Sequence, residues 1–328
     1  MDLRSVRCFV LGIALVLVVG CLPDAPHDNP RDPLNPDARG GLTGTVKGVT
    51  NITLSGARVE VLGSGLVGIV DTSGMYFIDG ILPGDYSVVA SIAGYTSDTG
   101  EVEIIPGAVD SLNFTLDGIP VVRWASVLSV HKSYYSGDEG VWIELSAGVM
   151  DPDLWVDIDS VWVEVRDSVL VLTQDSVVSS WDVVYGGVIA NSFGGDPLVV
   201  LVGEDFSFCV EDKIGVRETP VRETLVRIIA DVPVPVYPLT GDTVSFPCTF
   251  SWEKFTADFS FEYEFAIWSV EEGVDLAMGE RYEVTEIPSS QDSLTVEAEF
   301  SPGTYYWSIA VVDSVGNRSE RVEKIEVE

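Results

Sequence analysis

The fold of the last third of the chain is decided by one stretch, SPGTYYWSIAVVDSVGN (residues 301–317). A Pro-Gly turn leads into a run in which apolar side chains return at every second position. This period of two is typical of a strand that buries one face. Alternation places four side chains of the run on the inner face, those of Tyr305, Trp307, Ile309 and Val311. The stretch therefore predicts a long, half-buried strand.

The same alternation recurs through most of the chain, in short runs separated by glycine-containing turns. Hydrophobic residues make up 46% of the 328 residues, which is enough to fill real cores. Prolines within VPVPVYP (232–238) predict an extended linker before the last segment. We predict an all-β chain with five parts, an export signal (1–20), a tether (21–40) and three tandem β-sandwich domains (41–118, 119–230 and 231–328).

The first 20 residues carry the marks of an export signal. Arg4 and Arg7 precede an apolar run that ends at Gly20 and is shorter than the roughly 20 residues of a membrane-spanning helix. The signal would be cut before a cysteine, and Val18-Val19-Gly20-Cys21 resembles the bacterial lipobox. That resemblance implies cleavage before Cys21 and a lipid on its sulfur, so we expect the membrane to be a partner of the mature chain. An ordinary secretory signal is the alternative.

The residues after Cys21 predict where in the cell the domains are located. Residues 22–40 are rich in proline and aspartate and almost free of large apolar side chains, which is typical of a disordered, solvated spacer. Their segment 28–33 is similar to one that follows the lipidated cysteine in many envelope lipoproteins. The residue that follows Cys21 is Leu22 and not Asp, which resembles the sorting signal for the outer membrane in Gram-negative lipoproteins. We expect a bacterial cell-envelope protein that is lipid-anchored at the outer membrane.

Charge and reactive side chains exclude several classes of function. Lys and Arg total 18 against 52 Asp and Glu, and the net charge of −34 excludes electrostatic binding of nucleic acid. It also disfavours anionic headgroups, so attachment to the membrane must come from the lipid. Two histidines are too few for histidine-based zinc sites or Ser-His-Asp chemistry. Alternation turns Cys209 outward and Cys248 inward in different domains, which argues against a disulfide between them, although an oxidising envelope would permit one.

Several signature pieces fall in order along residues 41–117, namely Asp71-Thr72-Ser73-Gly74, Leu82-Pro83-Gly84-Asp85-Tyr86, Ala93-Gly94-Tyr95 and Leu112-Asn113-Phe114-Thr115-Leu116. Together they resemble the carboxypeptidase regulatory-like domain. The resemblance implies a transthyretin-like sandwich of the carbohydrate-binding-like fold group, which is a structural or binding module without catalytic residues. The name of the fold group does not by itself imply sugar binding.

The other two domains resemble further sandwich families. The run 206–212, followed by Lys213-Ile214-Gly215, is similar to the closing hairpin of bacterial immunoglobulin-like domains. The last segment resembles a fibronectin type III domain in the strand of Trp252, the Pro-Gly turn, a tyrosine-corner candidate at Tyr305 and the closing Asp-x-x-Gly-Asn.

One acidic stretch is a candidate metal site. Its carboxylates are those of Asp151, Asp153, Asp157 and Asp159. Carboxylate oxygens are the ligands that Ca²⁺ prefers, and Asp-x-Asp spacing lets one loop supply two of them. The stretch lacks the glycine turn of an EF-hand loop, and in so acidic a chain a solvated loop is the favoured interpretation. Calcium is therefore the alternative here, and no other cofactor is expected.

Two tryptophans in the middle domain are candidates for stacking against a sugar. Trp155 lies among these aspartates and Trp181 follows two serines. An exposed Trp beside carboxylates is typical of sugar-binding surfaces. A Trp in a β-domain more often fills the core or an edge, and this interpretation is favoured for both residues.

Three functions compete on this reading. The favoured one is a non-catalytic, membrane-anchored envelope lipoprotein whose sandwiches serve as a spacer and as a surface for protein binding or adhesion. The second is a glycan-binding surface lipoprotein, assisted by calcium at the acidic stretch. A hydrolase using two carboxylates is the third and is disfavoured, because nearly all acids are predicted on strand exteriors or turns. We therefore expect no enzyme, and partners among other envelope proteins or glycans.

Overall fold

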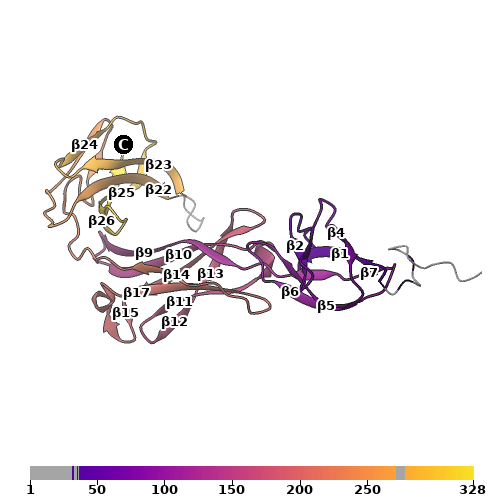
Figure 1. Ribbon diagram of the computed structural model, residues 1–328. Coiled ribbons are helices and arrows are strands. Elements are labelled where there is room, and N and C mark those ends of the chain that lie inside the picture. The colour runs from indigo at the N-terminus through magenta and orange to yellow at the C-terminus, as the bar shows by residue number, and fades with distance from the viewer. Residues whose placement is uncertain (1–31, 33–34, 36, 271–277) are drawn as a thin grey trace, which may run out of the picture. The chain divides into compact units, whose positions relative to one another are not determined.

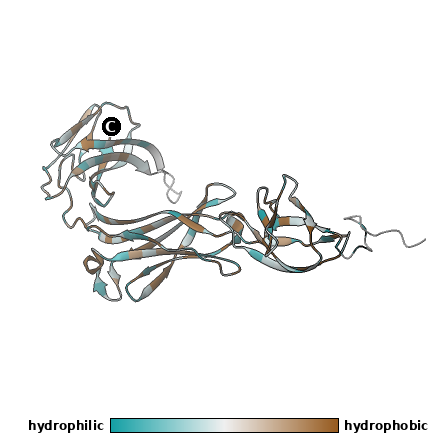
Figure 2. Ribbon diagram, viewed as in Figure 1, coloured by the Kyte–Doolittle hydropathy of each residue, from teal (hydrophilic) through white to brown (hydrophobic). Residues whose placement is uncertain are grey.

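The computed structural model describes residues 32, 35, 37–270 and 278–328 (Figure 1). Cys21 and its lipobox, on which the predicted lipidation depends, lie outside these residues. Within the described residues every regular element is a strand except two short 3-10 turns, η1 (Trp155–Asp157) and η2 (Leu198–Leu201). Figure 2 shows apolar and polar residues alternating along many strands. The predicted all-β class is confirmed.

The chain divides into two compact units. The first comprises residues up to 46 together with 55–90 and 99–114, and the second comprises residues 47–54, 91–98 and 115–328. Each is built from sandwiches of antiparallel sheets with a few parallel pairings.

The first unit is a sandwich of two sheets. One sheet contains β1 (Gly40–Gly48), β4 (Met75–Ile81), β7 (Val109–Ser111) and β8 (Phe114–Leu116). The other contains β2 (Arg58–Val61), β3 (Leu66–Ile69), β5 (Gly84–Ser91) and β6 (Asp98–Ile104). The faces touch where a Cβ added to Gly68 of β3 would lie 2.7 Å from the side chain of Ile78 of β4. Leu42 and Val88, one from each sheet, are fully buried between them.

The middle part of the second unit encloses its own core. Its first sheet is formed by β9 (Val121–Tyr134), β10 (Glu139–Met150), β13 (Thr173–Val177) and β14 (Asp182–Ala190). Its second sheet is formed by β11 (Ile158–Val165), β12 (Ser168–Val171), β17 (Asp205–Asp212) and β18 (Val221–Thr224). A small hairpin of β15 (Ser192–Phe193) and β16 (Asp196–Pro197) lies beside them. Phe206 and Phe208 are buried in this core, as alternation along their strand predicts.

The C-terminal part has a second core, rich in aromatic rings. Its larger sheet contains β20 (Thr243–Val244), β22 (Phe261–Val270), β23 (Met278–Pro288), β25 (Gly303–Asp313) and β26 (Arg318–Val327). Its smaller sheet contains β19 (Pro235–Tyr237), β21 (Cys248–Trp252) and β24 (Ser293–Val296). The four residues predicted inward in 301–317 are all buried in this core, and Phe250 packs edge-on against Trp307 with ring centroids 5.1 Å apart.

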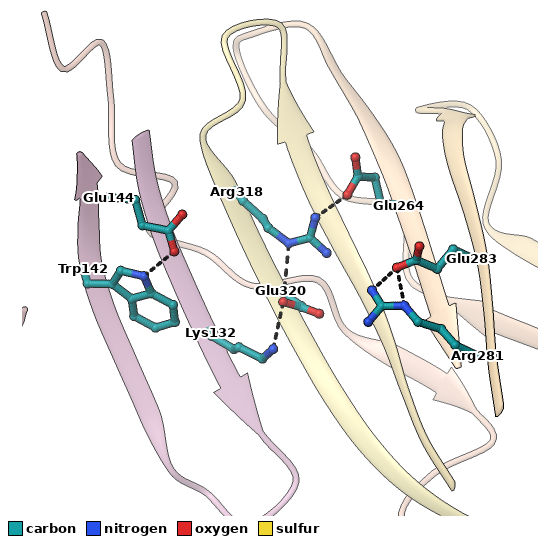
Figure 3. A network of polar contacts seen from close by, with 8 residues as sticks. All are labelled: Lys132, Trp142, Glu144, Glu264, Arg281, Glu283, Arg318 and Glu320. Atoms are coloured by element: carbon teal, nitrogen blue, oxygen red, sulfur yellow. Dashed lines mark hydrogen bonds and ion pairs between the residues drawn. The ribbon is translucent and has the colours of Figure 1, made fainter. Parts of the chain in front are cut away.

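The middle and C-terminal parts share one continuous sheet. β9 of the middle part pairs in parallel with β26, from Arg318 opposite Val130 to Val322 opposite Tyr134, which makes a nine-stranded sheet. Side chains reinforce this junction (Figure 3): Glu320 lies 3.2 Å from the Lys132 ammonium and 3.4 Å from the Arg318 guanidinium, which also contacts Glu264. The sequence did not predict this pairing.

Candidate metal centre

Three separate segments of the second unit, the residue after β8, the loop 151–157 and the end of β17, bring aspartates together. Asp117 follows β8, Asp151 and Asp153 follow β10, Asp157 ends η1, and Asp212 ends β17. We call Asp117, Asp151, Asp153, Asp157 and Asp212 the aspartate cluster. Their exposed fractions are only 4%, 0%, 0%, 9% and 1% in that order. Carboxylates are almost never this deeply buried unless they are paired, so the cluster requires a chemical explanation.

Three members of the cluster have the spacing of ligands to one ion. Asp117, Asp153 and Asp157 each offer a carboxylate oxygen, and these oxygens all lie within 4.8 Å of one another. Two oxygens bound to the same Ca²⁺ at about 2.4 Å can be no more than about 5 Å apart. One cation could therefore contact all three carboxylates without rearrangement of the backbone.

The loop 151–157 is folded by its own hydrogen bonds. The Asp153 amide donates to the carboxylate of Asp151 at 2.7 Å, and the Leu154 amide donates to the Asp151 carbonyl at 3.1 Å. Leu154 has a φ of 82°, a left-handed conformation that is rare for a branched residue. This turn directs two aspartates inward from one short segment, as the Asp-x-Asp spacing predicts.

Close approach by two glycines holds Asp153 in place. The Gly118 amide donates to one oxygen of Asp153 at 2.5 Å, and the Thr50 hydroxyl donates to the other at 3.3 Å. A Cβ added to Gly48 would lie only 2.1 Å from that second oxygen. The carboxylate therefore fits against bare backbone, which orients it toward the rest of the cluster.

Much of the negative charge of the cluster has no partner. Both carboxylate oxygens of Asp117 and one oxygen each of Asp151, Asp157 and Asp212 are buried without a hydrogen bond among the described residues. The neighbouring cation is Lys213, whose ammonium donates to the Val156 carbonyl. An unpaired buried charge is strongly unfavourable, so a bound cation would remove a large cost.

The carboxyl groups respond to this environment with raised pKa values. Burial raises the pKa of Asp117 to about 7, and the neighbouring Asp212 charge adds to the effect. Burial raises the pKa of Asp151 to about 7 as well. The pKa of Asp157 is raised by burial and by Asp212, and Lys213 opposes the shift. Tyr95 donates to the Pro152 carbonyl at 3.1 Å, and burial with the charges of Asp153 and Asp151 raises its pKa to about 12.

The donor set fits a hard divalent cation. Every side-chain ligand atom in the cluster is a carboxylate oxygen. Ca²⁺ and Mg²⁺ prefer such oxygens, whereas zinc prefers nitrogen and sulfur. His131 is engaged elsewhere, with Nε2 2.5 Å from Glu139 and Nδ1 3.1 Å from the Ile229 carbonyl. Because Ca²⁺ accepts irregular arrangements of six to eight oxygens, it fits ligands drawn from several loops best.

The sequence predicted part of this site. Asp151, Asp153 and Asp157 converge, whereas Asp159 is exposed on β11 and lies outside the cluster. The favoured interpretation of a solvated loop is wrong, because neighbouring loops cover the segment and leave Asp151 and Asp153 with no exposed surface. Asp117 and Asp212 were missed. Asp117 directly follows a strand and Asp212 ends one, which is the one signal the sequence offers for them, and only the fold brings them together.

The two candidate tryptophans behave differently. Trp155 is half-buried and packs against the core of the middle part, so the core interpretation is correct for it. Trp181 is 50% exposed, and the core interpretation is wrong there, because the residue lies in the turn between β13 and β14 rather than on a strand.

Both described cysteines are free. Cys248 is in the C-terminal core, as predicted. Cys209 is absent from the middle core, in agreement with its outward phase, but it is only 6% exposed; its partner in the strand register is Trp162. Burial raises the pKa of both thiols, which lowers their reactivity.

Comparison with known proteins identifies one part of the chain. Residues 41–117 match the family model of the carboxypeptidase regulatory-like domain. The chain therefore carries this domain, as its motifs predict, followed by further β-sandwiches. No curated protein matches the chain. Among the described residues no helix is long and apolar enough to cross a membrane.

Solved structures with a similar arrangement of strands are distant. A cohesin–X-dockerin complex from Acetivibrio cellulolyticus is 20% identical with a TM-score of 0.20, and the match covers 24% of this chain and 56% of that one. BcpA, the major pilin subunit of Bacillus cereus, is 11% identical with a TM-score of 0.30, and the match covers 88% of this chain and 96% of that one. SGBP-B of Bacteroides ovatus, solved with a mixed-linkage heptasaccharide, is 11% identical with a TM-score of 0.18, and the match covers 84% of this chain and 61% of that one. The chain spans little more than half of the first of these, and TM-scores below 0.5 assign it no ligand.

Proposed function

We propose that this chain is a non-catalytic, lipid-anchored protein of the bacterial envelope that binds Ca²⁺ at the aspartate cluster and acts as a spacer and binding or adhesion surface. The observation that carries the calcium assignment is the convergence of five buried aspartates from three segments of the chain, four of which have carboxylate oxygens without a hydrogen bond among the described residues. A divalent cation neutralises part of this charge and supplies the missing contacts.

The ion would hold separate loops of the second unit in one arrangement. The Gly118 amide and the Thr50 hydroxyl already contact Asp153, and the Lys213 amide donates to the Asp157 carbonyl at 2.9 Å. A cation between the carboxylates would join these segments at a common centre. Its role is therefore structural, since it stabilises the folded form rather than a reaction.

The geometry of the cluster supports a non-catalytic role. A hydrolase needs an accessible pocket with two carboxyl groups in unlike environments. Here the most exposed member, Asp157, shows 9% of its surface, so a macromolecular substrate has no access to the carboxylates. The lipid anchor at the outer membrane is proposed from the lipobox resemblance at Cys21 and the sorting signal at Leu22.

Thermal denaturation with and without calcium tests the metal assignment. We expect millimolar CaCl₂ to raise the melting temperature of the full chain by several degrees over metal-free buffer, since a ligand specific to the folded form stabilises it. The increase should be lost in Asp153→Asn and kept in Asp159→Asn. The second variant is the matched control, because it removes one charge from an exposed position nearby. Equal increases in both variants would mean that calcium acts through overall charge alone.

A further inference from the structure

An aromatic ring of the second unit is seated on the sheet and open to solvent. Trp124 on β9 lies directly opposite Gly148 on β10. A Cβ added to Gly148 would come 2.1 Å from the indole Nε1 and 2.4 Å from Cε2, so the ring covers the bare backbone of this glycine. Trp124 is nevertheless 47% exposed. The ring is thus supported on one side and available for stacking on the other.

Beside this ring is an open hollow of about 350 Å³. Its lining includes Arg123, Trp124, Val178 and Asp182. The guanidinium of Arg123 lies 3.3 Å from the carboxylate of Asp182, and both groups remain partly exposed. The hollow therefore combines one large aromatic ring with one donor and one acceptor, and its volume lies in the range of small-ligand sites, about 300–1,000 Å³.

We propose that this hollow binds a neutral oligosaccharide, with a sugar ring stacked on Trp124. Sugar rings offer an apolar face to an aromatic ring and hydroxyl groups that both donate and accept hydrogen bonds. Arg123 can donate to those hydroxyls and Asp182 can accept from them. Because the two charges balance, a charged ligand would gain little at this pair, and the net charge of −34 repels acidic glycans.

One wall of the hollow is attached to the loop that supplies the metal ligands. The Asp151 amide donates to the Trp181 carbonyl at 3.1 Å, and the Trp155 amide donates to the Ser180 carbonyl at 3.0 Å. The turn that receives these bonds continues directly into Asp182, whose carboxylate accepts from the Ser179 hydroxyl at 3.0 Å. Calcium binding should therefore fix the position of Asp182 in the hollow. This coupling, unlike the sugar site itself, rests on the proposed binding of Ca²⁺.

The test begins with the full chain on an array of neutral and acidic oligosaccharides in calcium buffer. The tightest neutral ligand is then titrated calorimetrically into the wild type, Trp124→Ala and Arg123→Gln. Tyr134→Ala is the matched control, because Tyr134 is an exposed aromatic residue at the other end of the same strand. We expect neutral glycans to be retained, each of the first two variants to weaken binding about tenfold or more, and the control to match the wild type.

Two results would overturn the sugar site: no neutral glycan retained on the array, or unchanged affinity in both Trp124→Ala and Arg123→Gln. Binding of the chain to acidic glycans alone also counts as the first result. So does binding to a protein partner without binding to any glycan. Coupling is tested separately by Asp153→Asn, which should weaken sugar binding as chelation does in the wild type. Sugar affinity that is unchanged by chelation would overturn the coupling. Calcium titration of Trp124→Ala should match the wild type, so failure of either proposal is distinguishable from failure of the other.

Discussion

Asp117 and Asp151 lie in surroundings that oppose their ionisation. Burial raises the pKa of each to about 7, against an ordinary value of 3.8. Without metal the folded chain therefore holds more protons than the unfolded chain at pH values between those two numbers. By linkage, the free energy of unfolding falls as pH rises through this window and levels off above about pH 7.

The melting temperature in metal-free buffer should consequently be lower at pH 8 than at pH 5. The variant Asp117→Asn should show a shallower decline, because it lacks one of the three cluster carboxyls with a raised pKa while the rest of the acidic surface is unchanged. Calcium at pH 8 should recover much of the lost stability in the wild type. A wild-type melting temperature that rises from pH 5 to pH 8 in metal-free buffer would contradict this account of the cluster.

The aspartate cluster also shows which site residues could be predicted from the sequence. From the Asp-x-Asp spacing, calcium at Asp151 and Asp153 was the alternative to the favoured solvated loop, and the structure buries both residues in the cluster. The same reasoning included Asp159, since charge spacing alone does not reveal which carboxylates of an entering strand face solvent. Asp117 and Asp212 were unpredictable because no local pattern links residues whose meeting depends on the tertiary fold.

At the scale of elements, the pairing of β9 with β26 joins the two parts of the second unit. Glu320 is 6% exposed and lies between Lys132 of β9 and Arg318 of its own strand. Burial opposes ionisation of Glu320, but Arg318 and Lys132 outweigh it and lower the pKa of this carboxyl. The Glu320 side chain is therefore ionised, and it contacts a cation on each of the two strands.

Replacing this anion should weaken the junction. Glu320→Gln removes the carboxylate that contacts Lys132 and leaves Arg318 with Glu264 alone, so it should lower the free energy of unfolding by about 1–3 kcal/mol. Glu283→Gln is the matched control, because Glu283 pairs with Arg281 on the exposed edge strand β23 and such pairs contribute about 0–1 kcal/mol. Chemical denaturation measures both values. Equal losses in the two variants would show that Glu320 has no special part in the junction.

The long strand within residues 301–317 was predictable, but the pairing of β9 with β26 was not. The period of two in residues 301–317 placed Tyr305 and Trp307 in the core, where the structure has them. The parallel contact of β9 with β26 joins strands almost 190 residues apart, as in the bond from the Ser129 amide to the Asn317 side chain. Alternation specifies which face of a strand is buried but not which strand lies at its edge.

For the whole molecule, the proposed lipid anchor at Cys21 would decide where in the cell the sandwiches act. The net charge of −34 opposes binding to anionic lipid headgroups, so attachment should depend on the lipid at Cys21. In a Gram-negative host, Cys21→Ser should abolish lipid labelling and shift the chain out of the membrane fraction. The wild type, labelled with a fatty-acid analogue, provides the comparison. A variant that stays with the membranes as a mature form would contradict the proposed anchor.

We propose that the aspartate cluster binds calcium through residues that only the fold brings together. Calorimetric titration of CaCl₂ into the full chain tests it most directly when the wild type is compared with Asp117→Asn. We predict a saturable isotherm for the wild type and a loss of at least about tenfold in affinity for the variant, because Asp117 offers one of the three oxygens within 4.8 Å. An absence of saturable binding in the wild type, or equal affinity in the two proteins, would contradict the account.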